Sequence, residues 1–246
     1  MTRSASISRK TGETDVSLTL GLAGTAAGTR STGVGFFDHM LDLLARHGRL
    51  DLTVTVTGDL QTGSHHTVED TGIVLGQALE ALAGAVRPPR DVDRAGRARL
   101  VHRDHGVAVA GDPAPVAERG VERLAFGQAL DAALGDRSGI ARFGHAVVPM
   151  DEARAACAID LSGRPYTYLD GSFEAERVAD FETDLAEEFF RAVANSAKLT
   201  LHVSVEAGTN PHHMVEVSFK AFARALRQAI AVDPRVQGVP STKGLL

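Results

Sequence analysis

Residues 50–69 read LDLTVTVTGDLQTGSHHTVE. From Leu50 to Val56 the sequence alternates apolar and polar side chains, a pattern that predicts a strand with one buried face. The stretch ends in a His-His-x-x-Glu cluster, His65 to Glu69, and apolar residues at roughly helical spacing continue to Leu82. It therefore predicts a strand, a cluster of polar side chains and a helix in succession.

The same succession of patterns recurs in residues 199–216, LTLHVSVEAGTNPHHMVE. Alternation from Leu199 to Val205 precedes a second His-His-x-x-Glu cluster, and another helical pattern follows the cluster. Helical patterns also precede both strands, at residues 36–47 and 189–197. A repeated unit of this size predicts an α+β protein of two duplicated βα half-domains, each a sheet with helices on one face.

The predicted half-domains are unequally spaced along the chain. We expect a first half-domain over residues 1–79 and a second over residues 131–246. Between them, residues 80–130 are rich in Arg, Asp, Gly and Pro, and their central part has weak periodicity. This composition predicts a loop-like insertion that interrupts the duplication.

Composition restricts the class of protein. The chain has 246 residues, of which 43% are hydrophobic and 23% charged, and a formal net charge of -5 gives no indication of nucleic-acid binding. Cys157 is the single cysteine, which excludes a disulfide within the chain and favours the cytosol. No apolar run approaches the roughly 20 residues of a membrane span, and the N-terminus lacks a signal-peptide core. We expect a cytoplasmic protein that binds neither nucleic acid nor membrane.

The two clusters have the residue types and spacing of metal ligands. In a helix, His65 and Glu69 are four residues apart and His66 and Glu69 three, so the carboxylate shares a face with at least one imidazole. Adjacent side chains diverge, so each His-His pair is better suited to two ions than to one. A lone His-His pair is more often a surface or capping feature, but its repetition at the same point of a duplicated unit favours metal ligation. The second cluster supplies His212, His213 and Glu216.

Other histidines have weaker signals. His39 lies at the start of a predicted helix, and His202 lies on a predicted strand, opposite its apolar face. Taken alone, both fit satisfied core or surface histidines better than ligands. His47, His102 and His105 are predicted not to bind metal.

Further motifs occur in order along the chain: Phe37-Asp38-His39-Met40-Leu41, the two His-His clusters, Gly139-Ile140-Ala141-Arg142-Phe143-Gly144, Asp160-Leu161-Ser162-Gly163-Arg164-Pro165-Tyr166, residues 219–229 and Pro240-Ser241-Thr242-Lys243-Gly244. Together these motifs resemble the imidazoleglycerol-phosphate dehydratase family. The resemblance implies a ribosomal protein S5 domain 2-like fold and a site with two Mn²⁺. It also implies a homo-oligomer of 24 subunits with its sites at subunit interfaces. The implied metal ligands are His39, His65, His66, Glu69, His202, His212, His213 and Glu216.

The resemblance also assigns the reaction. It implies dehydration of imidazoleglycerol phosphate to imidazole-acetol phosphate in histidine biosynthesis, by a metal-dependent hydro-lyase. The proton to be removed is on carbon and is poorly acidic, so a metal on the imidazole nitrogen would act as a Lewis acid and stabilise an imidazolate intermediate. The candidate acid-base residues are Glu13, Glu69 and Glu216. Sequence does not rank them. The resemblance favours Glu216 and Glu13, and it implies that Glu13 enters a neighbouring subunit's site.

A phosphorylated substrate also requires cationic anchors. The resemblance assigns this role to Arg142, Arg164, Lys220, Ser241 and Lys243, the last two in a C-terminal phosphate-binding tail. The chain departs from the family pattern at His145, where Asp is usual, and in residues 80–130. Two alternatives stay open. A two-metal hydrolase could use the same ligands, and a catalytically silent relative could keep the fold and the metal.

Overall fold

The computed structural model of the chain describes residues 4–22, 24–84, 90–92, 98–100, 139–171 and 176–235. The first half contains β1 (Ser4–Lys10), β2 (Thr14–Gly21), β3 (Arg30–Ser31), α1 (Gly35–Gly48), β4 (Asp51–Gly58), the 3-10 turn η1 (Leu60–Thr62) and α2 (His65–Gly84). The second contains β7 (Phe143–Met150), β8 (Ala153–Asp160), β9 (Tyr166–Asp170), β10 (Arg177–Val178), β11 (Phe181–Glu182), α4 (Leu185–Ser196), β12 (Thr200–Ala207) and α5 (Pro211–Ala229).

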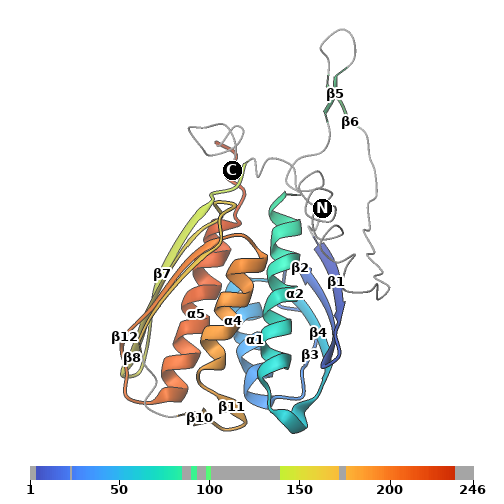
Figure 1. The fold of residues 1–246 in the computed structure, drawn as a ribbon. Helices are drawn as coiled ribbons and strands as arrows, with labels where there is room; N and C mark the ends of the chain where they lie inside the picture. Colours follow the sequence, from blue (N-terminus) through green and yellow to red (C-terminus); the bar gives the residue numbers. More distant parts are fainter. Residues whose placement is uncertain are drawn as a thin grey trace.

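The two halves have the same topology. Their four-stranded sheets have the orders β1-β2-β4-β3 and β7-β8-β12-β9, and in each the last pair in the order is parallel and the other pairs are antiparallel. The sheets form the two outer layers, and α1, α2, α4 and α5 lie between them (Figure 1). Helix α2 packs on β1 and β2, α5 packs on β7 and β8, and the halves meet where α2 contacts α4 and α1 contacts α5. The prediction of two duplicated α+β half-domains with helices on one face of each sheet is confirmed.

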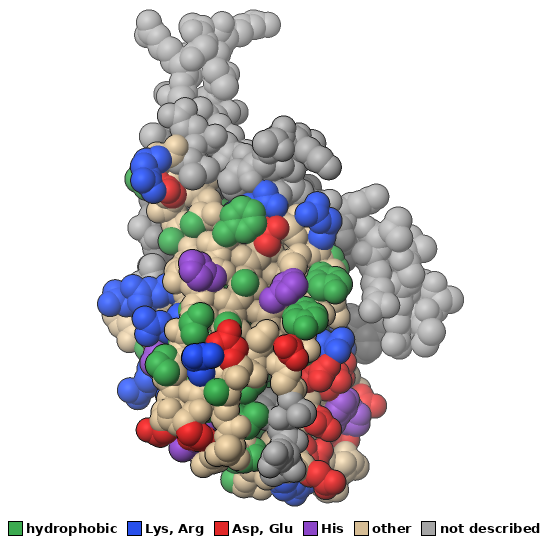
Figure 2. Space-filling view, turned by 90° about the vertical axis from the view of Figure 1, so that its left-hand side faces the viewer, with side chains coloured by type: hydrophobic (Ala, Val, Ile, Leu, Met, Phe, Trp, Pro, Cys, Tyr) green, Lys and Arg blue, Asp and Glu red, His purple; other side chains and the backbone are tan. Residues whose placement is uncertain are grey.

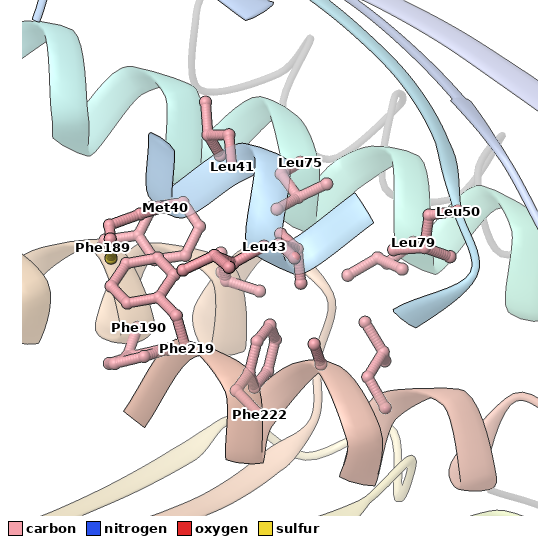
Figure 3. Close-up of a cluster of buried hydrophobic side chains, with 14 of the residues drawn as sticks. Met40, Leu41, Leu43, Leu50, Leu75, Leu79, Phe189, Phe190, Phe219 and Phe222 are labelled. Carbon is pink, nitrogen blue, oxygen red and sulfur yellow. The ribbon is translucent and has the colours of Figure 1, made fainter. Parts of the chain in front are cut away.

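The alternating patterns determine which face of each sheet is buried. In β4, Leu52, Val54 and Val56 face the helices, while the threonines between them are exposed. Between the layers lies an apolar core to which all four helices contribute, and its aromatic centre is a group of phenylalanines from α4 and α5 (Figure 3). Phe189 stacks on Phe219 with ring centroids 5.1 Å apart. This shared core joins the two halves into one packed unit.

Two glycines of α2 allow the halves to approach closely. A Cβ added at Gly76 would lie 2.6 Å from the carbonyl oxygen of Val193 in α4, and one added at Gly72 would lie 2.9 Å from that of Phe189. Both distances are too short for a real side chain, so larger residues would push α2 away from α4. The sequence therefore uses glycine inside a helix, at some loss of helix propensity, to bring the two halves together.

The predicted boundary at residue 79 differs from the end of the helix. Helix α2 continues to Gly84, because Glu80 and Leu82 are buried among the core residues. Of the predicted insertion, the structure also describes a short antiparallel pair, β5 (Arg90–Val92) with β6 (Ala98–Leu100); the rest of residues 85–130 lies outside the described residues. Among the described helices, none has both the length and the apolar character needed to cross a lipid bilayer.

Candidate metal centre

The first His-His-x-x-Glu cluster forms the opening turn of α2, which begins at His65. His65 Nε2 lies 3.7 Å from Glu69 Oε2. His66 faces a different group, since its Nδ1 lies 3.2 Å from both carboxylate oxygens of Asp59. The two rings are nearly perpendicular, at 78° with centroids 5.8 Å apart. As predicted from their adjacency, the two imidazoles therefore diverge.

The second cluster, in the first turns of α5, repeats this geometry. Asn210 caps the helix by accepting a hydrogen bond from the backbone N–H of His212, and Pro211 occupies the first turn. His212 Nε2 lies 3.1 Å from Glu216 Oε2, and His213 Nδ1 lies 2.8 Å from Glu152 Oε2. The rings are again nearly perpendicular, at 83° and 5.9 Å. Both helices begin at the lower end of the molecule as drawn in Figure 1.

The second cluster is the more enclosed of the two. The side chain of Glu216 is 12% exposed, whereas that of Glu69 is 44% exposed. Lys220 Nζ lies 2.7 Å from Glu216 Oε1, and His39 Nε2 of α1 lies 3.9 Å from Glu216 Oε2. Burial raises the pKa of Glu216, but Lys220, His39 and His212 together outweigh it and hold the pKa below its ordinary value. This carboxylate is therefore ionised at neutral pH.

These donors suit a divalent ion. His212 Nε2 and Glu216 Oε2 form a hydrogen bond of 3.1 Å, and about 3 Å is also the separation of two ligand atoms that are each about 2.1 Å from one ion at roughly a right angle. Within the described part of the chain, however, no group of three or more His, Cys, Asp or Glu side chains is already arranged to hold a metal. The described part of the chain thus presents matching pairs of candidate ligands but not a complete coordination shell.

The remaining predicted ligand, His202, lies on the opposite side of a sheet. It projects from β12 on the outer face of the second sheet, with its ring 5.9 Å from that of Tyr166 and 5.3 Å from that of Tyr168. That face carries histidine and large hydrophobic side chains (Figure 2). Phe143 and Tyr166 on it are 59% and 57% exposed. His202 is therefore separated from both clusters by the sheet and the helices beneath it.

The predicted phosphate anchors are also spread over the molecule. Arg142 forms a two-pronged ion pair with Asp160, with Nε 2.6 Å from Oδ1, and its backbone N–H donates to the carbonyl of Ala229 at the end of α5. At about 1.5 Å per residue, α5 rises roughly 20 Å between Glu216 and Ala229. Arg142 thus lies at the far end of α5 from Glu216. Arg164 is exposed, and Ser241 and Lys243 lie outside the described residues.

Glu13 lies close to the first cluster. Its backbone carbonyl accepts a hydrogen bond of 3.1 Å from the N–H of Asp59. Its charge is among those that raise the pKa of His66, after the larger effect of the hydrogen bond to Asp59. The turn between β1 and β2 therefore brings this candidate acid-base residue to the start of α2.

Sequence reasoning missed Asp59, Glu152 and Asp180. The hydroxyl of Thr62 donates a hydrogen bond of 2.7 Å to Asp59 Oδ2. This bond makes the largest contribution to lowering the pKa of Asp59 below its ordinary value. Glu152 accepts from His213 and from the backbone N–H of Asn210, and these bonds lower its pKa to about 2. The signal that could have drawn attention to Asp59 is the Asp-x-x-Thr spacing, which is typical of a local turn. Nothing local in the sequence indicates Glu152.

Asp180 is a helix cap supplied by the other half. Its carboxylate accepts hydrogen bonds from the backbone N–H groups of Gly35 at 2.5 Å and Phe36 at 3.0 Å. The N-cap residue of α1, Val34, makes no capping hydrogen bond of its own. Burial raises the pKa of Asp180, but these N–H groups outweigh it and lower the pKa overall. The ring of Phe36 in turn meets that of His212 edge-on, with centroids 5.1 Å apart. Asp180 thereby fixes the start of the helix that carries His39.

We expect Asp180→Ala to lower the free energy of unfolding by about 1 kcal/mol, the usual effect of losing an N-cap. Because the folded-state pKa of Asp180 is depressed, its contribution is present above the unfolded pKa of about 3.9 and is lost as pH falls through the folded value. Denaturant titration at neutral and acidic pH should therefore give a difference that shrinks below about pH 4. Asp184→Ala is the matched control, because Asp184 occupies the N-cap of α4 without a capping hydrogen bond; an equal loss in that variant would contradict the assignment.

Comparison with known proteins identifies the family. The model of the family described as imidazoleglycerol-phosphate dehydratase matches residues 32–113 and 104–226. The chain belongs to the imidazoleglycerol-phosphate dehydratase family. The enzyme of that name from Acetivibrio thermocellus is 43% identical over 246 residues, covering 100% of both chains. The one from Symbiobacterium thermophilum is 45% identical over 244 residues, covering 99% of this chain and 93% of the relative.

Solved structures of the family agree with the fold. The imidazoleglycerol-phosphate dehydratase of Staphylococcus aureus superposes with a TM-score of 0.67 at 30% identity, covering 93% of this chain and 99% of that chain. The corresponding enzyme of Pyrococcus furiosus gives a TM-score of 0.66 at 28% identity, covering 98% and 100%. The chain is therefore a dehydratase, and so a hydro-lyase, of histidine biosynthesis.

Proposed function

We propose that this chain dehydrates imidazoleglycerol phosphate to imidazole-acetol phosphate and water, with Mn²⁺ as its cofactor and two ions in each active site. The observation that carries the proposal is the repeated geometry of the clusters. In both, the first histidine turns Nε2 toward the motif glutamate, at 3.7 Å and 3.1 Å, and the second turns Nδ1 toward a carboxylate outside the motif. Membership of the family indicates the reaction in which we propose that these ligands take part.

The active site is completed between copies of the chain. His202 and Arg142 lie far from the clusters of their own chain, and an anchor at Arg142 is separated from Glu216 by roughly 20 Å along α5. A small phosphorylated substrate does not span that distance. A homo-oligomer, of 24 subunits by its resemblance to the family, would place His202 and Arg142 of one subunit beside the clusters of another. We expect this assembly in the cytoplasm, without nucleic-acid or membrane partners.

The side chains have separate tasks in this reaction. Bound manganese would act as a Lewis acid that stabilises negative charge on the imidazole ring of the substrate. Glu216 is kept ionised by Lys220, so its oxygens can accept the proton that leaves carbon. Glu13 and Glu69 are the other carboxylates that could take or return a proton. Arg142, Arg164, Lys220, Ser241 and Lys243 would bind the phosphate as cationic and hydroxyl donors.

We expect the purified full-length chain with Mn²⁺ to convert imidazoleglycerol phosphate to imidazole-acetol phosphate. Mass spectrometry of the reaction measures the product directly. A chelator should abolish turnover, and added Mn²⁺ should restore it. Release of inorganic phosphate instead would favour the two-metal hydrolase, and metal binding without any turnover would favour the silent relative; either result contradicts the proposal.

A further inference from the structure

The second histidine of each cluster faces a carboxylate that lies outside the His-His-x-x-Glu cluster. His66 Nδ1 lies 3.2 Å from Asp59, and His213 Nδ1 lies 2.8 Å from Glu152. A carboxylate in its ionised form only accepts hydrogen bonds, so the Nδ1 atom that faces it must carry the proton. In a neutral imidazole the lone pair is then on Nε2. The same arrangement therefore occurs in both halves of the molecule.

The two carboxylates come from unrelated places in the duplicated fold. Asp59 follows β4 and stands directly before the 3-10 turn that leads into α2. Glu152 lies in the turn between β7 and β8, far in sequence from α5. Since the topologies of the halves are otherwise the same, the duplication does not explain why both second histidines have such a partner. The shared feature is the chemistry at Nδ1 and not the position of the accepting carboxylate in the fold.

Both carboxylates are themselves held in place. Thr62 donates its hydroxyl hydrogen to Asp59 Oδ2 at 2.7 Å. The backbone N–H groups of Asn210 and Thr209 donate to Glu152 Oε1 at 2.9 Å and 3.3 Å, while Oε2 faces His213. Glu152 is thus left with Oε2 on the ring of His213, while both oxygens of Asp59 lie 3.2 Å from His66 Nδ1. Hydrogen bonds of this type fix the tautomer and the ring orientation of metal-binding histidines.

We infer that Asp59 and Glu152 are positioning residues that hold His66 and His213 in the Nδ1–H tautomer and thereby present Nε2 as the ligand atom. The inference rests on the proposed metal site. It assigns Asp59 and Glu152 no contact with substrate or metal. Their effect is on the metal affinity of the ring that each one holds.

Isosteric variants test this inference without removing the anchoring bonds. In Glu152→Gln the amide oxygen can keep the backbone bonds to Asn210 and Thr209, which turns the amide NH2 toward His213 Nδ1. Nδ1 must then accept, so the proton moves to Nε2. Asp59→Asn should act on His66 in the same way, because both side-chain oxygens of Asp59 lie 3.2 Å from Nδ1 and the amide NH2 therefore comes within hydrogen-bond reach of that atom.

Two measurements on the full-length protein decide the matter. Solid-state NMR of ¹⁵N-histidine-labelled, metal-free protein, well above the ordinary histidine pKa, should show Nδ1–H for both rings in the wild type and Nε2–H for the affected ring in each variant. Competition of Mn²⁺ against a chelator should show an affinity about 10- to 100-fold lower in each variant. Glu206→Gln, which alters a carboxylate paired with Arg154 and not with histidine, is the control and should change neither result.

The outcomes separate this inference from the proposed function. Unchanged tautomers in the variants, or Mn²⁺ affinity equal to that of the wild type, would overturn the positioning role. Wild-type protein that binds no Mn²⁺ would overturn the proposed function, while the tautomers of the metal-free protein would still report on Asp59 and Glu152. A loss of affinity accompanied by the same loss in Glu206→Gln would indicate a general structural effect and would also count against the inference.

Discussion

Replacing His65 and His212 together by Ala should remove bound manganese and abolish dehydration. Each histidine supplies the Nε2 that faces the glutamate of its own cluster, so the double variant removes a ligand from both halves. Structural Zn²⁺ sites with four ligands bind with about 10–16 kcal/mol, or about 3 kcal/mol per ligand, and we take the same order of magnitude per ligand here. The loss of one ligand thus lowers affinity about 100-fold at each site. Turnover should fall with the metal, because in the proposed mechanism the metal acts as a Lewis acid at the imidazole.

Metal content after dialysis, measured by elemental analysis, provides the test. His65 and His212 side chains are 53% and 44% exposed, so their removal should leave the fold intact, which circular dichroism can verify. His102→Ala combined with His105→Ala is a matched control, because it likewise removes two histidines. Both are predicted not to bind metal. Unchanged metal content in the His65 and His212 variant would show that the ligand assignment is wrong.

Local patterns were sufficient for the repeated unit. The predicted strands at 50–56 and 199–205 correspond to β4 at Asp51–Gly58 and β12 at Thr200–Ala207, and the predicted helix at 36–47 corresponds to α1 at Gly35–Gly48. A period of two residues, or of 3.6, is present in the sequence wherever one face is buried. Helix α4 begins at Leu185, four residues before the predicted start at 189, because Leu185 and Ala186 are also buried and extend the apolar stripe ahead of Phe189.

Contacts between distant segments were not predictable in the same way. Asp180 caps α1 from a hairpin 145 residues farther along the chain, and Glu152 meets a histidine 61 residues away. The capping signal is normally a residue next to the helix, and here it comes from the other half-domain. The divergence of adjacent histidines was predictable, because it follows from side-chain directions along one helix. Which carboxylate each histidine would meet was not, because that depends on how the turns are placed around the helix.

The ion pair between Lys198 and Glu80 should have a large effect on stability. Glu80 projects from α2 with its side chain 2% exposed, and Lys198 Nζ, from the turn between α4 and β12, lies 2.7 Å from Oε1. The pair thus joins the first half to the second beside the contact of α2 with α4. Lys198→Met would leave the carboxylate buried without its counter-charge. Loss of one partner of a buried pair costs about 3–5 kcal/mol, and because Lys198 is 36% exposed we expect the lower end, about 3 kcal/mol.

A second variant distinguishes the loss of the ion pair itself from the burial of an unpaired carboxylate. Adding Glu80→Leu to Lys198→Met removes the stranded carboxylate, and an apolar replacement of a buried ion pair is often neutral or stabilising. We therefore expect denaturant titration to show that the double variant recovers most of the stability lost in the single one. Lys10→Met is the control, since Lys10 pairs with Asp15 at 2.8 Å but both side chains are more than half exposed, at 78% and 52%. Exposed pairs contribute about 0–1 kcal/mol, so a loss in Lys10→Met as large as that in Lys198→Met, or no recovery in the double variant, would mean that burial of Glu80 is not the source of the effect.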